Sequence, residues 1–387
     1  MPVIAQYLKD KDNNFNLLRF IAASTVVYQH CYPLLGFADG NSYFANIVNA
    51  VAIFFVISGF LISKSWDESK NLVNFGKKRF YRIVPGLFIC LIFTIIIIGP
   101  LCTNLSLSEY FSQKQTYRYV LKNISFNTAF RIKSLFESNP YPQAVNGSLW
   151  TLELEVFCYI MVAVFGVFLA KIKINLAKFL ILLTATLIIL LKLVENNQNQ
   201  DLQSLILQYL PEICKHPSYV EMSIYFAIGS LYYHYRQRLK IIPIIAIAIL
   251  PIYLLNQQFY LNKYLNFAIL PYLVFYFALA IKPTNPKLAN FGKTHDLSYG
   301  IYIYAFPIQQ AVIYFLLTSQ ILKPFLSNFA PELGNITATS NHDLNIILFA
   351  FLFFSSYSIS LIFAFLSFKY IEKPCLDYGH KQIKASS

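Results

Sequence analysis

The stretch Asn14–Phe37, NFNLLRFIAASTVVYQHCYPLLGF, is an apolar run long enough to cross a bilayer, yet it contains Arg19 and His30. These two residues are eleven positions apart, so on a helix they share one face, roughly 16 Å apart along the axis. Ionisable residues inside a membrane span are costly and by default mark a functional site that faces the protein interior. The alternatives are that Arg19 only extends to the lipid headgroups and that His30 is only a hydrogen-bonded packing residue.

The composition is that of a membrane protein. The chain has 387 residues, of which 57% are hydrophobic and 13% are charged, and its mean hydropathy is +0.51. A soluble domain would carry roughly 25% charged residues. The formal charge of +13 could indicate nucleic-acid binding, but the basic residues lie between the apolar runs, as anchors on the cytoplasmic face do. We therefore expect a polytopic protein whose partners include membrane lipid and exclude nucleic acid.

Apolar segments of spanning length predict an all-α protein with about ten transmembrane helices. No linker, repeat or GxSxG motif marks a second domain, so residues 1–387 are expected to form a single membrane-bound domain. The predicted spans are at about 15–36, 43–63, 83–101, 149–170, 174–194, 220–235, 241–256, 265–281, 298–318 and 344–369.

The distribution of basic residues predicts the topology. Ten spans place both termini on one side, and the segments on that side hold 21 of the 31 Lys and Arg residues, against nine on the other side. The positive-inside rule then predicts that both termini are cytoplasmic. Arg19 would lie near the cytoplasmic boundary and His30 toward the outer leaflet. The outer segments at about 102–148, 195–219 and 319–343 are polar and aromatic, and could hold a sugar or be solvated connectors.

The six cysteines show no CxxC motif and no spacing typical of a metal site, and no His, Asp or Glu pattern suggests one. We predict no metal. Cys102 and Cys214 both fall in segments that are predicted to lie outside, so a disulfide between them is an open alternative.

A basic cluster follows the second span in the sequence GKKRFYRIVPGLF, residues 76–88. Arg79 and Arg82 are three positions apart and share a helical face, with Lys77 and Lys78 beside them. Arginine forks bind phosphate oxygens bidentately, and this side of the membrane is the one where nucleotides are available. The positive-inside rule alone would also produce such a cluster, so both interpretations stay open.

Two carboxylates lie at the outer start of the fourth span, in NGSLWTLELEVFCYI, residues 146–160. Glu153 and Glu155 are separated by about 200° around a helix, so they cannot both face one cavity. A carboxylate near His30 could hold the tautomer of the imidazole and stabilise its charged form. Histidine has an unperturbed pKa of about 6.5, which suits a general base near neutral pH.

Six motifs occur in order along the chain and resemble those of acyltransferase family 3, the integral membrane enzymes that O-acylate bacterial surface glycans and other acceptors. Glu155 matches the carboxylate of the family motif, whereas Glu153 occupies a variable place. The ninth-span motif often has a histidine before Phe-Pro, and here Ala305 stands there. The six motifs are LLRFIAASTVVYQH with the Arg-x10-His pair, FFVISGFLIS, KKRFYRIVP, NGSLWTLELEVFCY, LSYGIYIYAFP and YIEKP.

The resemblance implies a multi-pass O-acyltransferase of the inner (cytoplasmic) membrane. The expected reaction is O-acetylation from cytoplasmic acetyl-CoA, or another acyl-CoA, to a hydroxyl of a cell-surface polysaccharide or its lipid-linked precursor. His30 and Glu155 would be catalytic, and Arg19, Arg79 and Arg82 would bind the donor.

Several alternatives remain at the level of sequence. Transfer could be direct or pass through an acyl-histidine intermediate, and the acyl group could be acetyl, succinyl or longer. The rival function is a transporter or flippase for a lipid-linked sugar without acyl-transfer chemistry, and a signalling or scaffold membrane protein is also open. The acceptor, its hydroxyl and the oligomeric state are not predicted.

Overall fold

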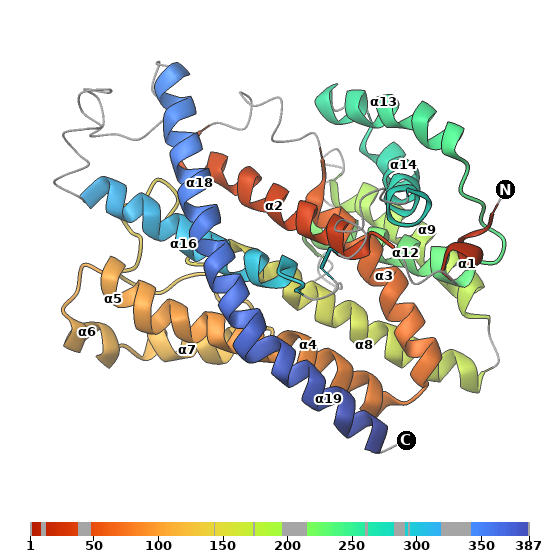
Figure 1. Cartoon of the computed structure of the whole chain (residues 1–387), viewed down its shortest axis with the longest axis horizontal. Coiled ribbons are helices and arrows are strands. Elements are labelled where there is room, and N and C mark those ends of the chain that lie inside the picture. The colour runs from red at the N-terminus through yellow and green to blue at the C-terminus, as the bar shows by residue number, and fades with distance from the viewer. Residues whose placement is uncertain are drawn as a thin grey trace. The chain divides into compact units, whose positions relative to one another are not determined.

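All the regular secondary structure that the structure describes is helical, apart from two isolated β-bridges (Figure 1). The predicted all-α class is thus confirmed. The structure is a computed structural model and describes residues 2–8, 13–37, 48–142, 144–172, 175–195, 215–259, 262–281, 291–292, 295–318 and 342–385.

Each of the ten predicted spans coincides with a helix. These helices are α2 (Phe15–Leu34), α3 (Ala50–Ser69), α4 (Leu72–Phe93) continuing through Thr94–Ile98 into α5 (Gly99–Cys102), α8 (Trp150–Lys171), α9 (Leu176–Glu195), α12 (Pro217–His234), α13 (Pro243–Phe259), α14 (Lys263–Phe275) continuing through Tyr276–Ala280, α16 (Ser298–Thr318), and α18 (His342–Ser367) continuing through Phe368–Glu372 into α19 (Lys373–Ala385). Shorter helices are α1 (Ile4–Tyr7), α6 (Leu107–Ser112) and α7 (Lys114–Ile124).

Within the described residues, seven helices are long and apolar enough to cross a membrane. They are Ala50–Ser69, Leu72–Cys102, Gly147–Lys171, Leu176–Glu195, Lys263–Ala280, Ser298–Thr318 and Asn345–Ala385. α13 is apolar but shorter. α2 and α12 are not among the seven, because polar and ionisable residues lower their mean hydropathy; in α2 these include Arg19, Gln29 and His30.

The second and third spans are longer than the sequence predicts. α3 continues to Ser69 and α4 begins at Leu72, whereas segment 64–82 was expected to connect two spans. Lys70 ends α3 with a left-handed φ of 46°, and its N–H donates to the Trp66 carbonyl. Hydropathy marks the part of a helix that can lie in lipid, and charged residues extend the helix beyond it. Residues 43–47, where the second span was predicted to begin, lie outside the described residues.

The helices divide between two compact units. Unit 1 comprises Met1–Ala22, Ile47–Gly76 and Leu154–Thr294, and unit 2 comprises Ala23–Asn46, Lys77–Glu153 and His295–Ser387. α2, α4 and α8 each pass from one unit into the other. The prediction that residues 1–387 act as a single domain stays a prediction.

The core of unit 1 contains a close crossing of α3 and α12. A Cβ on Gly59 would lie 2.0 Å from the backbone oxygen of Phe226, and a Cβ on Gly229 would lie 2.1 Å from that of Val56. Small residues let helix backbones approach closely in membrane proteins. This crossing therefore depends on both glycines.

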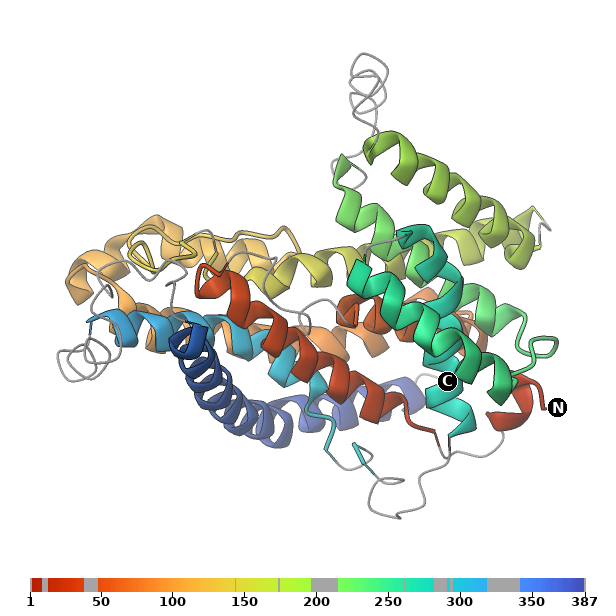
Figure 2. The ribbon, with the colours of Figure 1, turned by 90° about the horizontal axis from the view of Figure 1, so that it is seen from above.

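Unit 2 is built on the packing of α16 against α18. A Cβ on Gly300 would lie 2.7 Å from Ala364, so these helices also meet at a small residue. α18 continues through Phe368–Glu372 into α19 without a break, and Figure 2 shows the two as one continuous blue ribbon that changes direction along its length.

We expect Gly59→Ala to lower the thermal unfolding midpoint of the purified protein by several degrees. The added methyl group meets a backbone oxygen, so α3 and α12 must move apart, and overpacking of this kind costs about 1–3 kcal/mol. Gly76→Ala is the matched control, because its Cβ would meet no atom within 4 Å. An unchanged midpoint for Gly59→Ala would show that the crossing is not as close as described.

Candidate functional site

His30 lies on the part of α2 that belongs to unit 2. It is partly buried, and its Nδ1 is buried without a hydrogen-bond partner among the described residues. Its ring meets that of Phe306 edge-on, with centroids 5.1 Å apart and an interplanar angle of 77°. A buried polar atom without a partner needs an explanation. Here the imidazole keeps hydrogen-bonding capacity, which a general base requires.

Pro307 of α16 determines how the loop before α8 is attached. Proline has no N–H, so the carbonyl of Ile303, four residues earlier, loses its helical donor. The Asn146 side chain donates to this oxygen at 2.8 Å and the Cys90 thiol donates at 3.2 Å. In a membrane span such a carbonyl has to be satisfied internally. The asparagine of the NGSLW motif therefore replaces a bond that the Phe-Pro motif removes.

Gly147 lies directly after this attachment. A Cβ on Gly147 would lie 2.5 Å from the Phe306 ring, so only glycine lets the loop approach the ring this closely. Phe306 in turn packs against His30. Motifs from the first, fourth and ninth predicted spans thus meet around one aromatic ring. Ala305, which stands where the ninth-span motif often has a histidine, is buried.

Gln309 holds the turn of α2 that carries His30. It is fully buried, and its Nε2 donates to the Val27 carbonyl at 2.8 Å and to Cys31 Sγ at 3.1 Å. These bonds fix both the axial position and the rotation of α2 next to His30. The imidazole is therefore positioned by an amide on α16.

Gln310 holds the loop before α8 in the same way. Its Nε2 donates to the carbonyls of Tyr141 and Ala144 at 2.7 and 2.8 Å, and its own oxygens accept from Asn139. Because consecutive helical residues differ by about 100°, one glutamine reaches α2 and the next reaches the loop. α16 is thus bonded both to α2, next to His30, and to the loop before α8.

Arg82 lies on α4 and forms an ion pair with Asp296, with 2.6 Å between Nη2 and Oδ2. The other oxygen of Asp296 accepts from Ser298 N at 3.2 Å and from its hydroxyl at 2.6 Å, which caps the start of α16. The Arg82 guanidinium also lies 5.9 Å from the centre of the Tyr299 ring. Arg82 therefore has a protein partner, and its predicted contact with donor phosphates stays a prediction.

Glu372 of the YIEKP motif lies near this pair. It is 1% exposed; its Oε1 accepts from Ser367 at 2.8 Å, while its Oε2 is buried without a partner among the described residues. A Cβ on Gly86 would lie 2.9 Å from Tyr299 and 3.2 Å from the Glu372 carboxyl carbon. Glycine at 86 thus makes room for a buried carboxylate one turn away from Arg82.

The two glutamates of α8 have separate partners, as their spacing predicts. Glu153 accepts from the backbone N–H of Thr128 at 3.0 Å. Glu155 accepts from the Ser58 hydroxyl at 2.5 Å and from Tyr159. Ser58 belongs to the FFVISGFLIS motif, so two family motifs meet at Glu155.

The predicted site residues fall in both units. His30, Arg79 and Arg82 belong to unit 2, whereas Arg19 and Glu155 belong to unit 1. Nε of Arg19 is buried without a hydrogen-bond partner among the described residues. The predicted pairing of Glu155 with His30, and the donor-binding role of the three arginines, stay predictions.

The described residues contain no group of three or more His, Cys, Asp or Glu side chains that could hold a metal ion. Cys102 is buried and carries a free thiol. Cys214, the other half of the disulfide considered above, lies outside the described residues.

Sequence reasoning missed four residues of this arrangement: Asp296, Gln309, Gln310 and Glu372. Each had a signal. Asp296 stands two positions before Ser298 at the start of a span, where acidic residues cap helices. The two glutamines are a polar pair inside an apolar run, and Glu372 is the carboxylate of a motif whose role was left open.

Comparison with known proteins agrees with the sequence motifs. The family model described as "Acyltransferase domain" (Acyl_transf_3) matches residues 12–365. An "O-acetyl transferase" of Shigella phage Sf6 is 31% identical over 305 residues, which are 78% of this chain and 86% of that protein. "Nodulation protein 10" of Rhizobium leguminosarum bv. viciae is 34% identical over 166 residues, or 38% of this chain and 42% of that protein. No solved structure matches.

The family model covers nearly the whole chain, and the first relative covers more than two thirds of it at over 30% identity. The predicted resemblance is confirmed: this chain is a membrane protein that belongs to acyltransferase family 3.

Proposed function

We propose that this acyltransferase is an O-acetyltransferase that moves an acetyl group from acetyl-CoA to a carbohydrate hydroxyl. The observation that carries the proposal is His30, whose buried Nδ1 has no partner among the described residues at the point where three family motifs meet. The "O-acetyl transferase" name of the Shigella phage relative supports the acetyl group. A cell-surface polysaccharide or its lipid-linked precursor is the proposed acceptor.

In the proposed reaction, His30 accepts the proton of the acceptor hydroxyl as its oxygen attacks the thioester carbonyl. The carbon–sulfur bond breaks, and the CoA thiolate leaves and takes the proton from the imidazolium. Glu155 stabilises the charged imidazole and orients its ring. Transfer through an acyl-histidine is the variant of this scheme, in which His30 forms the first bond to the acetyl carbon.

The donor side is proposed to be cytoplasmic, in the inner membrane. Arg79 and Arg82 lie one turn apart on α4, and with Arg19 they supply guanidinium groups that suit the phosphates of acetyl-CoA. The reaction needs no metal ion, because the thioester is already activated.

The proposed topology has ten spans with both termini inside, and it is supported by the 21 to nine distribution of Lys and Arg. Reporter fusions at residues 387 and 70 should therefore read cytoplasmic, and fusions within 102–148 and 319–343 should read external. An external reading at residue 70 would place Arg79 and Arg82 on the wrong side for a cytoplasmic donor.

Turnover of acetyl-CoA with a glycan acceptor tests the catalytic assignment. General-base catalysis contributes about 10²- to 10⁴-fold, so His30→Ala should lower turnover by at least that much while the affinity for CoA stays near that of the wild type. Glu155→Gln should also lower turnover strongly, because it removes the charge that stabilises the imidazolium.

Glu153→Gln is the matched control on the same helix, since glutamine still offers an oxygen to the Thr128 N–H. It should change turnover little. Normal acetyl transfer by His30→Ala would overturn the mechanism, and a stronger effect of Glu153→Gln than of Glu155→Gln would overturn the role of Glu155.

Isothermal titration with CoA separates donor binding from structural pairing at Arg82. Loss of a charge-assisted bond of about 1.5–3 kcal/mol should weaken CoA binding roughly 10- to 150-fold in Arg82→Ala. Asp296→Asn should keep or raise the affinity, because asparagine can still cap α16 while Arg82 loses its competing anion. If both variants lower thermal stability alike and neither changes CoA affinity, the arginine only ties α4 to α16.

A further inference from the structure

α7 of unit 2 lies beside a helix that is long and apolar enough to cross a membrane, Leu72–Cys102. α6 begins within a few residues of the end of this helix, and a Cβ on Gly99 would overlap the Tyr110 hydroxyl of α6. Further along, Tyr119 of α7 lies near Cys90 of α4. α7 therefore runs back alongside the span, and Figure 1 shows it next to α4.

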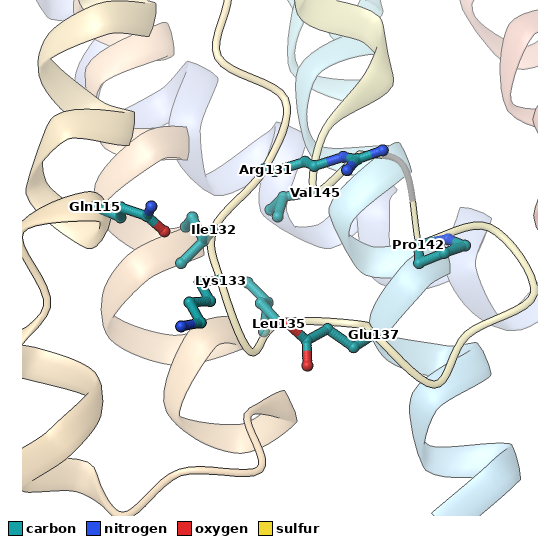
Figure 3. Close-up of a pocket in the computed structure, with 8 residues that line it drawn as sticks. All are labelled: Gln115, Arg131, Ile132, Lys133, Leu135, Glu137, Pro142 and Val145. Carbon is teal, nitrogen blue, oxygen red and sulfur yellow. The ribbon is translucent and has the colours of Figure 1, made fainter.

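One face of α7 is packed against the protein. The Asn123 side chain donates to the carbonyls of Tyr119 and Ala129 at 2.8 and 3.0 Å. In Figure 3 the Gln115 side chain points from α7 toward Ile132 of the loop that follows. These contacts fix the rotation of the helix, and therefore also the side chains that its other face presents. The buried residues of α7 are Thr116, Tyr119, Val120 and Asn123.

The other face of α7 carries three basic residues at every fourth position. Lys114, Arg118 and Lys122 follow one another at steps of about 40° and about 6 Å, so they project from the same side of the helix. Within the part of the chain that the structure describes, none of the three has a hydrogen bond or an ion pair. The only acidic residue of α6 and α7 is Glu109, which accepts from the N–H and the hydroxyl of Ser106 at 3.0 and 2.7 Å. These three cations therefore lack an anionic partner in the described structure.

An apolar edge lies next to this basic row. Tyr117 and Leu121 are 49% and 65% exposed, and Leu107 of α6 is 60% exposed. The Tyr117 hydroxyl donates to the Phe111 carbonyl at 3.0 Å, which fixes the ring. By the same helical steps, Tyr117 and Leu121 lie directly beside Lys114. The exposed face of α7 is thus divided into a basic strip and an apolar strip.

This division fits a lipid partner better than a purely polar one. Helices that bind at a membrane interface combine Lys and Arg with Trp, Phe or Leu, and they bind anionic lipids through the basic residues. A soluble anion would use the basic strip but leave the apolar strip exposed to water. Beside a span, long basic side chains can extend to the headgroup layer while their stems cover apolar surface. Arginine forks, moreover, suit phosphate oxygens.

We propose that the exposed face of α7 binds anionic phospholipid. Arg118, Lys114 and Lys122 hold the headgroup phosphates, and Tyr117 and Leu121 contact the first methylene groups of the acyl chains. The partner carries a net negative headgroup, as phosphatidylglycerol does, because three unpaired cations give little preference for a lipid without net charge. This surface is independent of the acetyl-transfer reaction, so its test needs no acyl donor.

The test titrates the full-length protein in detergent with phosphatidylglycerol and with phosphatidylcholine, and native mass spectrometry counts the bound lipids. Phosphatidylglycerol should bind at least about 10-fold more tightly, since each basic residue favours an anionic lipid. Its affinity should fall with added salt, which screens exposed charges. Equal affinities for the two lipids would overturn the proposal.

Variants of the basic strip locate the binding. Lys114→Gln, Arg118→Gln and Lys122→Gln should each weaken phosphatidylglycerol binding about 5-fold, because one basic residue contributes roughly 1 kcal/mol at an anionic lipid surface. Lys133→Gln is the matched control, since it removes the same charge from an exposed position outside α7. Thermal unfolding checks that all four variants fold. An equal loss in Lys133→Gln and Arg118→Gln would overturn the assignment to α7.

Competition and the apolar strip separate a lipid from other anions. Leu121→Ser should weaken the binding of both lipids, and unchanged binding would overturn the contact with acyl chains. Glycerol 3-phosphate and a soluble glucuronic acid oligomer should leave phosphatidylglycerol in place. Displacement by the first would identify a site for a free phosphate, and displacement by the second a site for an acidic glycan. Either result would overturn the proposal that the partner is a lipid.

Discussion

The bond between the Asn146 side chain and the Ile303 carbonyl is the interaction on which the site around His30 depends. Pro307 removes the helical donor of this carbonyl, and an unsatisfied carbonyl in a membrane span costs several kcal/mol. Asn146 satisfies it and is thereby held against α16. Gly147 then lies on the Phe306 ring, and this ring packs on His30. The position of the His30 imidazole thus depends on Pro307, through Asn146, Gly147 and Phe306.

Arg82 in unit 2 meets the same requirement for an internal partner. Arg82 is paired with Asp296, and the carboxylate of Glu372 is buried nearby. A charge taken out of water is tolerated only when it is paired and hydrogen-bonded. Asp296 also caps α16, so the ion pair and the start of that helix depend on one side chain. The bond to Asp296 uses one of the five N–H donors of the Arg82 guanidinium.

The sequence predicted the positions of the helices well, but it did not predict which side chains bond to one another, and the reason is physical. Hydropathy locates a stretch that can lie in lipid, so all ten predicted spans coincide with helices, but it stops at charged residues. It therefore missed that α4 begins at Leu72. Helical periodicity gives the face on which Arg82 lies, but not a partner 214 residues away.

The carboxylates of α8 show the same limit. Their spacing predicted separate environments for Glu153 and Glu155, and the structure gives them separate partners. The identity of those partners, a loop N–H and the hydroxyl of Ser58, depends on tertiary packing that no local pattern encodes.

α16 sets the distance between the Arg82–Asp296 ion pair and His30. Ser298 at the Asp296 cap and Gln309 beside His30 are eleven residues apart, which is about 16 Å along a helix. The same spacing separates Arg19 from His30 on α2. Pro307 leaves the Ile303 carbonyl without its helical donor, and the loop before α8 supplies a donor through Asn146. Withdrawal of that loop would release both the Ile303 carbonyl and the two carbonyls that Gln310 holds. The loop before α8 and the turn of α2 that carries His30 are therefore both bonded to α16, the loop through Asn146 and Gln310 and the turn through Gln309.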